Sequence, residues 1–352
     1  MNTVVNIQFL RAVAAFSVLI YHFSLQYKTI TGGELNSFYW LFNQIGYAGV
    51  DFFFVISGYI MWITTRKLTA KLPVAQFAYK RLTRIYLGYW PYFFLAILLI
   101  TIFPNLTPQS VNLWGSFLLV EPHIHKLLIQ VAWTLQFELY FYFIFTLLLL
   151  LPVSKRLVAI GLFAGAIIIY QMLATSQGGF TLSGFLLSPF CLQFFVGCFL
   201  GYYFEQRRIN YKRFLVAGLS VLILAIYYQA KTLNQTLADN HYLIQRVLIF
   251  GTAAACIMAA LIEMEKRGMQ LFKNLSIILG GSSYSIYLSH TLAIALVYAL
   301  GWQTWIQQNN QSPGWWIGLF MLLTVIYSVI HYLWVEKPLM ALASHIRKRF
   351  FK

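Results

Sequence analysis

Long runs of apolar residues, separated by short polar connections, repeat along the whole chain. A helix needs about 20 apolar residues to cross the hydrocarbon core of a bilayer, and the sequence offers ten such runs. Because the connections leave no room for an inserted soluble domain, the pattern predicts one helical bundle in the membrane. The expected spans are residues 7–26, 41–64, 85–103, 132–151, 157–174, 185–204, 214–230, 244–263, 283–301 and 314–335.

We expect one transmembrane domain over residues 1–340 and a basic cytoplasmic tail over 341–352. The stretch Val335-Glu336-Lys337-Pro338 is interpreted as a helix stop, at which the chain leaves the membrane. The longest connection, 104–131, contains three prolines and is expected to form a re-entrant or surface segment.

The composition excludes a soluble globular protein. Hydrophobic residues make up 60% of the 352 residues and charged residues only 10%, whereas soluble proteins have about a quarter charged residues. We therefore predict an all-α, polytopic integral membrane protein with about ten spans. The first helix has no cleavage site of small residues and is expected to be retained. The three cysteines, Cys191, Cys198 and Cys256, are interpreted as buried apolar residues that form neither a disulfide nor a metal site.

The formal net charge of +16 is unevenly distributed. If the N-terminus lies inside, the outer loops hold only Lys28, Lys126 and Lys231, which places both termini in the cytoplasm by the positive-inside rule. This distribution assigns the basic excess to topology and anionic lipid and argues against a nucleic-acid partner. The residues expected in cytoplasmic segments are Arg66, Lys67, Lys71, Lys80, Arg81, Arg84, Lys155, Arg156, Arg207, Arg208, Lys212, Arg213, Lys266, Arg267, Lys273, Lys337, Arg347, Lys348, Arg349 and Lys352.

Two ionisable residues, Arg11 and His22, interrupt the first apolar helix. Eleven residues separate them, which puts both side chains on one helix face and about 16 Å apart along the axis. Ionisable groups in a membrane helix are costly unless they line a polar cavity. Taken singly, Arg11 could extend to the headgroups and His22 could be a satisfied core histidine. The aligned pair favours a functional site.

A basic and aromatic stretch precedes the third expected span. Arg81 and Arg84 lie three residues apart, as neighbours on a helix that faces the cytosol, and Trp90 follows them. They are either topology charges next to an aromatic belt or a grip for the phosphates of a cytosolic ligand, because arginine donors match phosphate geometry.

Two carboxylates occur within expected spans. Asp51 precedes three phenylalanines and shares a helix face with Val55 and Gly58. It is either functional or paired with an arginine or the backbone. Glu138 is the only carboxylate of the fourth span, and its natural partner is His22 or an arginine.

The ninth expected span follows a helix break at Gly280-Gly281. Ser283, Tyr287 and His290 then share one helix face. They either serve a site or cap the helix and join neighbouring helices by hydroxyl hydrogen bonds. His123, His125 and His241 fall in expected outer loops, and the sequence has no helix-borne cluster with metal-ligand spacing.

Six motifs in this order resemble the family-3 membrane acyltransferases, and more closely their bacterial exopolysaccharide O-acetyltransferase branch. The resemblance extends from the first helix to the last. The sequence departs from the usual family motifs at two places: Gln8-Phe9 replaces the usual Asp-Gly pair, and Leu87 replaces a common proline. The motifs are Leu10-Arg11-Ala12-Val13-Ala14-Ala15 with His22, Gly49-Val50-Asp51-Phe52-Phe53-Phe54-Val55-Ile56-Ser57-Gly58, Lys80-Arg81-Leu82-Thr83-Arg84-Ile85-Tyr86 with Tyr89-Trp90, Trp133-Thr134-Leu135 with Glu138, Ser283-Tyr284-Ser285-Ile286-Tyr287-Leu288 with His290, and Glu336-Lys337-Pro338.

The resemblance implies transfer of an acyl group, usually acetyl, from cytosolic acyl-CoA to a sugar hydroxyl of a nascent surface glycan. His22 would be the general base or transient acyl carrier, oriented by Glu138 or Asp51. The donor phosphates would bind Arg11, Arg81 and Arg84. The substrate or oxyanion would contact Ser283, Tyr287, His290 and Trp90.

This reading requires no tightly bound cofactor and no metal. The partners it implies are acyl-CoA, a polysaccharide or lipid-linked oligosaccharide acceptor, and the lipids of a bacterial cytoplasmic membrane. Two other classes remain open. A transporter or flippase for a lipid-linked saccharide would also have ten spans with buried charges, and a proton-relay or scaffold component of a synthase complex would use only the buried carboxylates.

Overall fold

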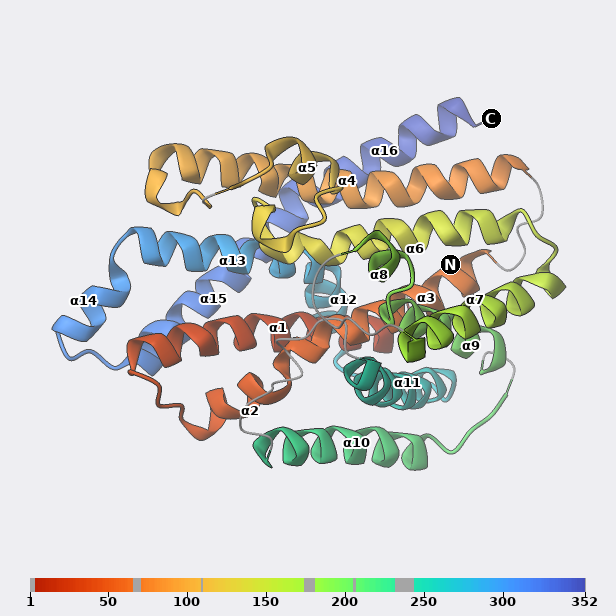
Figure 1. The fold of residues 1–352 in the computed structure, drawn as a ribbon, viewed down its shortest axis with the longest axis horizontal. Helices are drawn as coiled ribbons and strands as arrows, with labels where there is room; N and C mark the ends of the chain where they lie inside the picture. The colour runs from red at the N-terminus through yellow and green to blue at the C-terminus, as the bar shows by residue number, and fades with distance from the viewer. Residues whose placement is uncertain are drawn as a thin grey trace. The chain divides into compact units, whose positions relative to one another are not determined.

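The computed structural model describes residues 4–65, 71–108, 110–173, 181–204, 207–231 and 244–351. Arg66, Lys67, His241 and Lys352 lie outside these ranges. Within them the chain is all helical, without a strand, as predicted (Figure 1). The helices are α1 Val5–Ile30, α2 Ser37–Ile45, α3 Gly49–Thr65, α4 Lys71–Ile102, α5 Leu113–Leu118, α6 Trp133–Leu149, α7 Val153–Leu173, α8 Leu182–Leu186, α9 Phe190–Tyr203, α10 Tyr211–Lys231, α11 Ile244–Lys266, α12 Lys273–Gly281, α13 Ser283–Ala299, α14 Trp302–Gln308, α15 Pro313–His331 and α16 Lys337–Phe350.

The prediction of about ten spans is confirmed. Nine helical runs in the described residues are long and apolar enough to cross a membrane, and the number is ten if α13 and α14, bent by 56°, are counted together as one span. The third span begins earlier than expected, because α4 runs unbroken from Lys71 to Ile102 and includes both Arg81 and Arg84. The expected break at Gly280-Gly281 lies between α12 and α13, at Ser282.

The expected helix stop at residues 335–338 is wrong. A π-helical turn, Tyr332–Glu336, follows α15 directly, and α16 continues the helix from Lys337 to Phe350. The backbone N–H of Lys337 donates to the carbonyl of Tyr332, five residues earlier. This turn resets the hydrogen-bond register just before Pro338, which then falls in the first turn of α16, where a missing N–H is tolerated.

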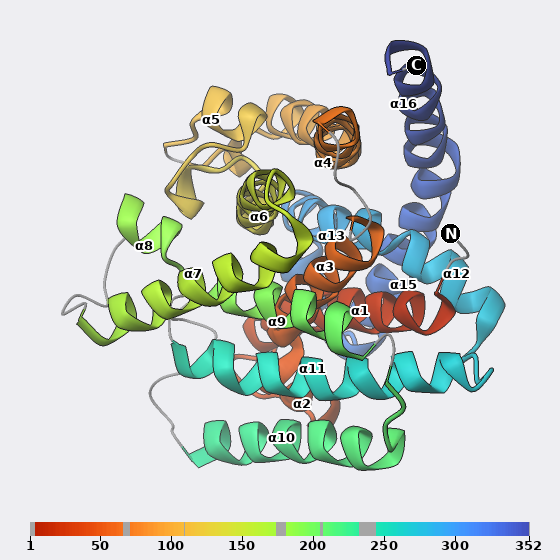
Figure 2. The ribbon, with the colours of Figure 1, turned by 90° about the vertical axis from the view of Figure 1, so that its right-hand side faces the viewer.

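The chain divides into two compact units, and each is described separately. The first comprises residues 1–14, 48–79 and 137–280. Its core joins α1, α3, α9 and α11 through buried apolar residues that include Leu10, Val55 and Met258. The helices α10 and α11 run side by side in both views (Figures 1 and 2).

The helices α3 and α9 approach so closely that their backbones touch. A Cβ atom on Gly58 would lie 1.9 Å from the carbonyl oxygen of Phe194, and one on Gly197 would lie 2.1 Å from that of Val55. Only glycine allows this contact, which is the small-residue packing typical of helices in membranes.

The second unit comprises residues 15–47, 80–136 and 281–352. In it α13 packs on α15 and on α14. The proline-containing connection 104–131 is folded: it contains α5 and 3₁₀ turns at Pro104–Leu106, Ile124–Lys126 and Gln130–Ala132. Tyr86 and Tyr89 of α4 donate to carbonyls of α5, which ties this connection to a spanning helix.

Candidate active site

Arg11 and His22 lie on one uninterrupted helix, α1, as the sequence predicts. The rise of an α-helix separates them by about 16 Å. The boundary between the two units falls between Ala14 and Ala15, so Arg11 belongs to the first unit and His22 to the second. The Nη1 atom of Arg11 donates to Gln8 Oε1 at 3.1 Å, one turn away on the same helix.

In the second unit, His22 meets a second histidine. His290 Nε2 lies 3.2 Å from His22 Nδ1, and the ring centroids are 4.7 Å apart. His290 is fully buried and His22 is half-buried. The sequence placed His290 on the functional face of its helix but gave no reason to pair it with His22.

Backbone carbonyl groups beside the two rings indicate which nitrogen of each ring carries the proton. His22 Nδ1 lies 2.9 Å from the carbonyl of Val18, and His290 Nδ1 lies 3.3 Å from that of Ile286, each one turn earlier on its own helix. A carbonyl only accepts, so each neutral ring carries its proton on Nδ1. His290 Nε2 then accepts from His22 Nδ1, and His22 Nε2 keeps an unprotonated lone pair, the form that a base or nucleophile requires.

The face of α13 that includes His290 is buried. The Tyr287 and His290 rings have centroids 5.8 Å apart. Tyr287 donates to the carbonyl of Val131 and accepts from Thr134, each at 3.0 Å. Since a tyrosine hydroxyl has one proton, Tyr287 must break its bond to Val131 before it can donate to a substrate oxygen. Ser283, one turn before Tyr287, is fully buried.

Arg84 takes part in a chain of polar contacts at the end of α15. It forms an ion pair with Glu336, which is 1% exposed, and its guanidinium lies 5.2 Å from the ring centroid of Tyr284. The other carboxylate oxygen of Glu336 accepts from Ser285 at 2.8 Å. Ser285 Oγ also lies 3.3 Å from Nδ1 of His331. A buried, hydrogen-bonded carboxylate therefore holds Arg84 in place.

The other basic and aromatic residues of α4 have different surroundings. Arg81 is half-buried, one turn before Arg84. Trp90 stacks on Phe117, with ring planes 6° apart, and donates its indole N–H to the Phe117 carbonyl at 3.2 Å. The polar atom of Trp90 is thus used within the fold.

In the first unit, Asp51 is paired with an arginine, one of the two readings of the sequence. Arg246 Nη2 lies 3.1 Å from Asp51 Oδ2, and Gln193 Nε2 lies 2.6 Å from Oδ1. All three side chains are buried. Both oxygens of the carboxylate therefore have partners, which join α3, α9 and α11.

Glu138, on α6, is less enclosed. Its Oε1 atom accepts from the hydroxyl of Tyr142, one turn later, and from Ser57 of α3 at 3.3 Å. The side chain is half-buried, whereas Asp51 has no exposed surface. Of the two carboxylates, Glu138 is the one whose partners are neutral hydroxyls rather than a cation.

Comparison with known proteins shows the family to which the chain belongs. The family model described as an acyltransferase domain matches residues 4–333. The chain belongs to this acyltransferase family. The resemblance inferred from the motifs is therefore confirmed. The acyltransferase is also 29% identical, over 305 residues, to the exopolysaccharide production protein ExoZ of Rhizobium meliloti (strain 1021), an alignment that covers 84% of this chain and 90% of ExoZ. No solved structure gives a significant match.

In this acyltransferase, the side chains that contact the predicted site residues include several that the sequence analysis did not single out. The sequence analysis gave Arg246 no role and named Glu336 only as part of a terminal motif. Ser285 and His331 were given no role. The sequence could have pointed to these residues because they are polar and lie inside apolar runs. A charged or hydroxyl-bearing residue in such a run needs a partner. In the part of the chain that the structure describes, no group of three histidine, cysteine or carboxylate side chains could hold a metal ion.

Proposed function

We propose that this protein is an O-acyltransferase of the bacterial cytoplasmic membrane. It moves a short acyl group, usually acetyl, from cytosolic acyl-CoA to a hydroxyl of an exported polysaccharide or of its lipid-linked precursor. Membership of the acyltransferase family supports the reaction class. The similarity to an exopolysaccharide production protein supports the acceptor class.

The His22–His290 pair carries this proposal. Its tautomers leave His22 Nε2 as the unprotonated nitrogen, and free imidazole titrates near neutral pH. In the proposed step, His22 Nε2 takes the proton of the acceptor hydroxyl while the hydroxyl oxygen attacks the thioester carbonyl carbon. The C–S bond then breaks, and the CoA thiolate receives the proton from the imidazolium. Transfer through an acyl group held on Nε2 uses the same nitrogen.

A carboxylate would complete the arrangement by stabilising the imidazolium. We propose Glu138 for this role in preference to Asp51. Both oxygens of Asp51 accept from Gln193 and Arg246, so its negative charge is already compensated.

The acyl donor would be held by its phosphates. Arg11, Arg81 and Arg84 are the proposed ligands, because arginine donates in a fork that matches phosphate oxygens. The spacing of about 16 Å between Arg11 and His22 along α1 is about the reach of an extended pantetheine arm. The phosphates would stay at the cytosolic side while the thioester reaches His22. Acyl-CoA acts here as a co-substrate, with no tightly bound cofactor.

The test uses the purified full-length protein in lipid vesicles with radiolabelled acetyl-CoA and a lipid-linked glycan. We expect label in the glycan as an ester that mild base releases, and no transfer by His22→Ala at normal protein abundance. Movement of the glycan across the bilayer without acylation would instead support the transporter reading. Full transfer by His22→Ala would make His22 structural and contradict the proposed mechanism.

A further inference from the structure

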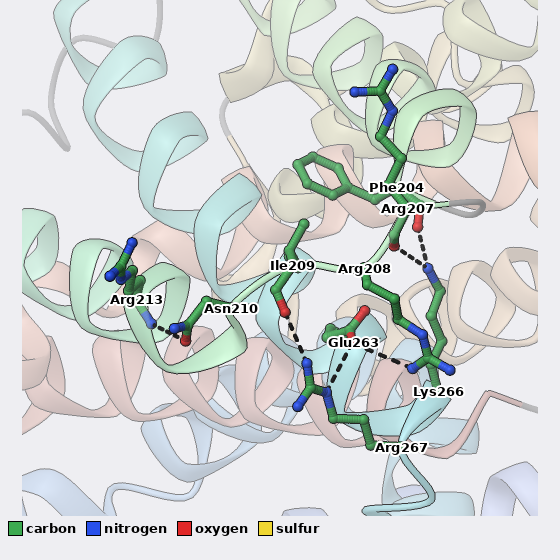
Figure 3. Close-up of polar contacts among 9 residues, drawn as sticks. All are labelled: Phe204, Arg207, Arg208, Ile209, Asn210, Arg213, Glu263, Lys266 and Arg267. Atoms are coloured by element: carbon green, nitrogen blue, oxygen red, sulfur yellow. Dashed lines mark hydrogen bonds and ion pairs between the residues drawn. The ribbon is translucent and has the colours of Figure 1, made fainter.

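A cluster of basic side chains lies in the first unit, where α9, α10 and α11 end or begin. Glu263, near the end of α11, is 1% exposed and accepts from Arg267 at 2.9 Å and from Arg208 at 3.4 Å (Figure 3). One buried carboxylate therefore faces two cations. We call the group formed by Arg207, Arg208, Lys212, Arg213, Lys266 and Arg267 the basic cluster.

The segment between α9 and α10, which carries Arg207 and Arg208, is held to α11 by hydrogen bonds. Lys266 Nζ donates to the carbonyl of Phe204, and to that of Arg207 at 3.1 Å. Arg267 donates to the carbonyl of Ile209 at 3.1 Å. The side chain of Asn210, just before α10, then accepts from the backbone N–H of Arg213. Positive charges that only set the orientation in the membrane need no defined conformation. The conformation of this segment, in contrast, is held by these hydrogen bonds.

The outer members of the cluster remain exposed. The Arg208 side chain is 66% exposed and that of Arg267 is 44% exposed, although both contact Glu263. Arg207, Lys212 and Arg213 are exposed as well. In Figure 3, the side chains of Arg207 and Arg213 lie apart from the Glu263 ion pairs and from each other.

The acidic residues nearby do not balance this charge. The carboxylate of Glu265 accepts from the backbone N–H groups of Val5 and Asn6 and thereby caps the start of α1. The sequence adds Glu205, which lies outside the described residues. The basic cluster thus has six positive charges, whereas the acidic residues are only Glu263, Glu205 and Glu265, and Glu265 already caps α1.

Tyrosines place the cluster at the depth of lipid headgroups. The Arg207 guanidinium lies 4.2 Å from the ring centroid of Tyr203, the last residue of α9. That of Arg267 lies 5.3 Å from the ring of Tyr211, the first residue of α10. The run Leu182–Tyr203 that ends with α9, and the helices α10 and α11, are long and apolar enough to span a membrane. Interfacial tyrosines mark the level of the headgroups.

We propose that the basic cluster binds the headgroup of an anionic phospholipid in the adjacent leaflet. Its excess positive charge matches a lipid phosphodiester that carries a net negative charge, and its depth fits a lipid better than a soluble nucleotide. This inference does not depend on the acyl-transfer reaction.

The test measures binding of phosphatidylglycerol and phosphatidylcholine to the delipidated protein in detergent, by native mass spectrometry. The variant Arg207→Gln/Lys212→Gln/Arg213→Gln removes three exposed charges and leaves both partners of Glu263 in place. Each charge removed should weaken phosphatidylglycerol binding about fivefold, while phosphatidylcholine binding stays unchanged.

A matched control, Lys28→Gln/Lys155→Gln/Lys231→Gln, removes the same charge from three exposed lysines on separate helices. We expect it to bind phosphatidylglycerol as the wild type does. Equal weakening in both variants would mean that only net charge matters, and unchanged binding in the cluster variant would remove the site; either result overturns the proposal. Displacement of phosphatidylglycerol by equimolar CoA would also overturn it, in favour of a nucleotide phosphate.

Discussion

His290 Nε2 lies 3.2 Å from His22 Nδ1, although 268 positions separate the two residues in the sequence. The contact joins α1 to α13 within the second unit. Because each ring faces the carbonyl one turn earlier, the pair has a single neutral arrangement of protons that satisfies all these contacts. His290 is thus a positioning residue for the nitrogen that we propose as the base.

The first prediction separates the roles of the two rings. His22→Ala should lower kcat by at least about 100-fold, the usual contribution of a general base. His290→Ala should lower kcat about tenfold with little change in KM, because it removes only the acceptor that orients His22. His290→Gln, whose amide oxygen still accepts, should recover most of the loss. If His290→Gln and His290→Ala behave alike, the ring does not act through this hydrogen bond.

The second prediction concerns Arg84 and Glu336. Arg84→Gln leaves the carboxylate of Glu336 buried without its cation, so it should lower stability by a few kcal/mol and raise the KM for acyl-CoA about tenfold. Arg84→Gln/Glu336→Gln should recover the thermal stability but keep the high KM. Arg81→Gln serves as the comparison and should raise KM alone. A double variant with wild-type KM would limit Arg84 to a structural role.

The third prediction tests Asp51. Asp51→Asn should lower stability by about 3–5 kcal/mol, because Arg246 is left buried and unbalanced. Asp51→Leu/Arg246→Leu replaces the pair with apolar residues and should recover most of the thermal midpoint in detergent. We expect the double variant to retain acyl transfer. A stable but inactive double variant would return Asp51 to the catalytic residues.

The fourth prediction is a pH dependence from the folded connection 104–131. Burial raises the pKa of Glu121, but the backbone N–H of His123, the amide of Asn112 and the charge of Lys126 outweigh it, so the pKa lies below the usual 4.5. A depressed pKa means that Glu121 stabilises the fold above about pH 4.5 and loses this contribution as the pH falls through its folded pKa. The thermal midpoint should therefore exceed that of Glu121→Gln at pH 6, and the difference should shrink as the pH falls below 4.5. A difference independent of pH would contradict this account.

The helical architecture was largely predictable from the sequence, because hydropathy over about 20 residues reports directly on membrane spanning. The partners of buried polar groups were not. An arginine was one of the partners that the sequence allowed for Asp51, but hydropathy does not say which arginine reaches it. The sequence suggested Glu138 or Asp51 as the group that orients His22, and it did not predict the contact with the ring of His290.

The end of the last span is a second feature that could not be predicted from the sequence. Pro338 has the same local sequence signal whether a helix stops or changes its hydrogen-bond register. Only the π turn at Tyr332–Glu336 shows that the helix continues and that Glu336 faces Arg84 and Ser285. Such turns have no reliable sequence pattern, although they occur often at functional sites.

The fifth prediction concerns the glycines between α3 and α9. Gly58→Ala should lower the thermal midpoint strongly, because the new Cβ would clash with the Phe194 carbonyl. Gly161→Ala in α7, where nothing lies within 4 Å of a Cβ, is the matched control. It should be neutral or stabilising by up to about 1 kcal/mol. Equal effects of the two substitutions would show that the close approach is not required.

The same backbone contact has a mechanical consequence. Packed helices slide past one another when the side chains between them repack, but at Gly58 and Gly197 no side chains intervene. The bond between Asp51 and Gln193 pins the two helices again, seven residues before Gly58 and four before Gly197. We therefore expect the helices α3 and α9 to behave as one rigid body, so that a rearrangement of the first unit would keep this pair together.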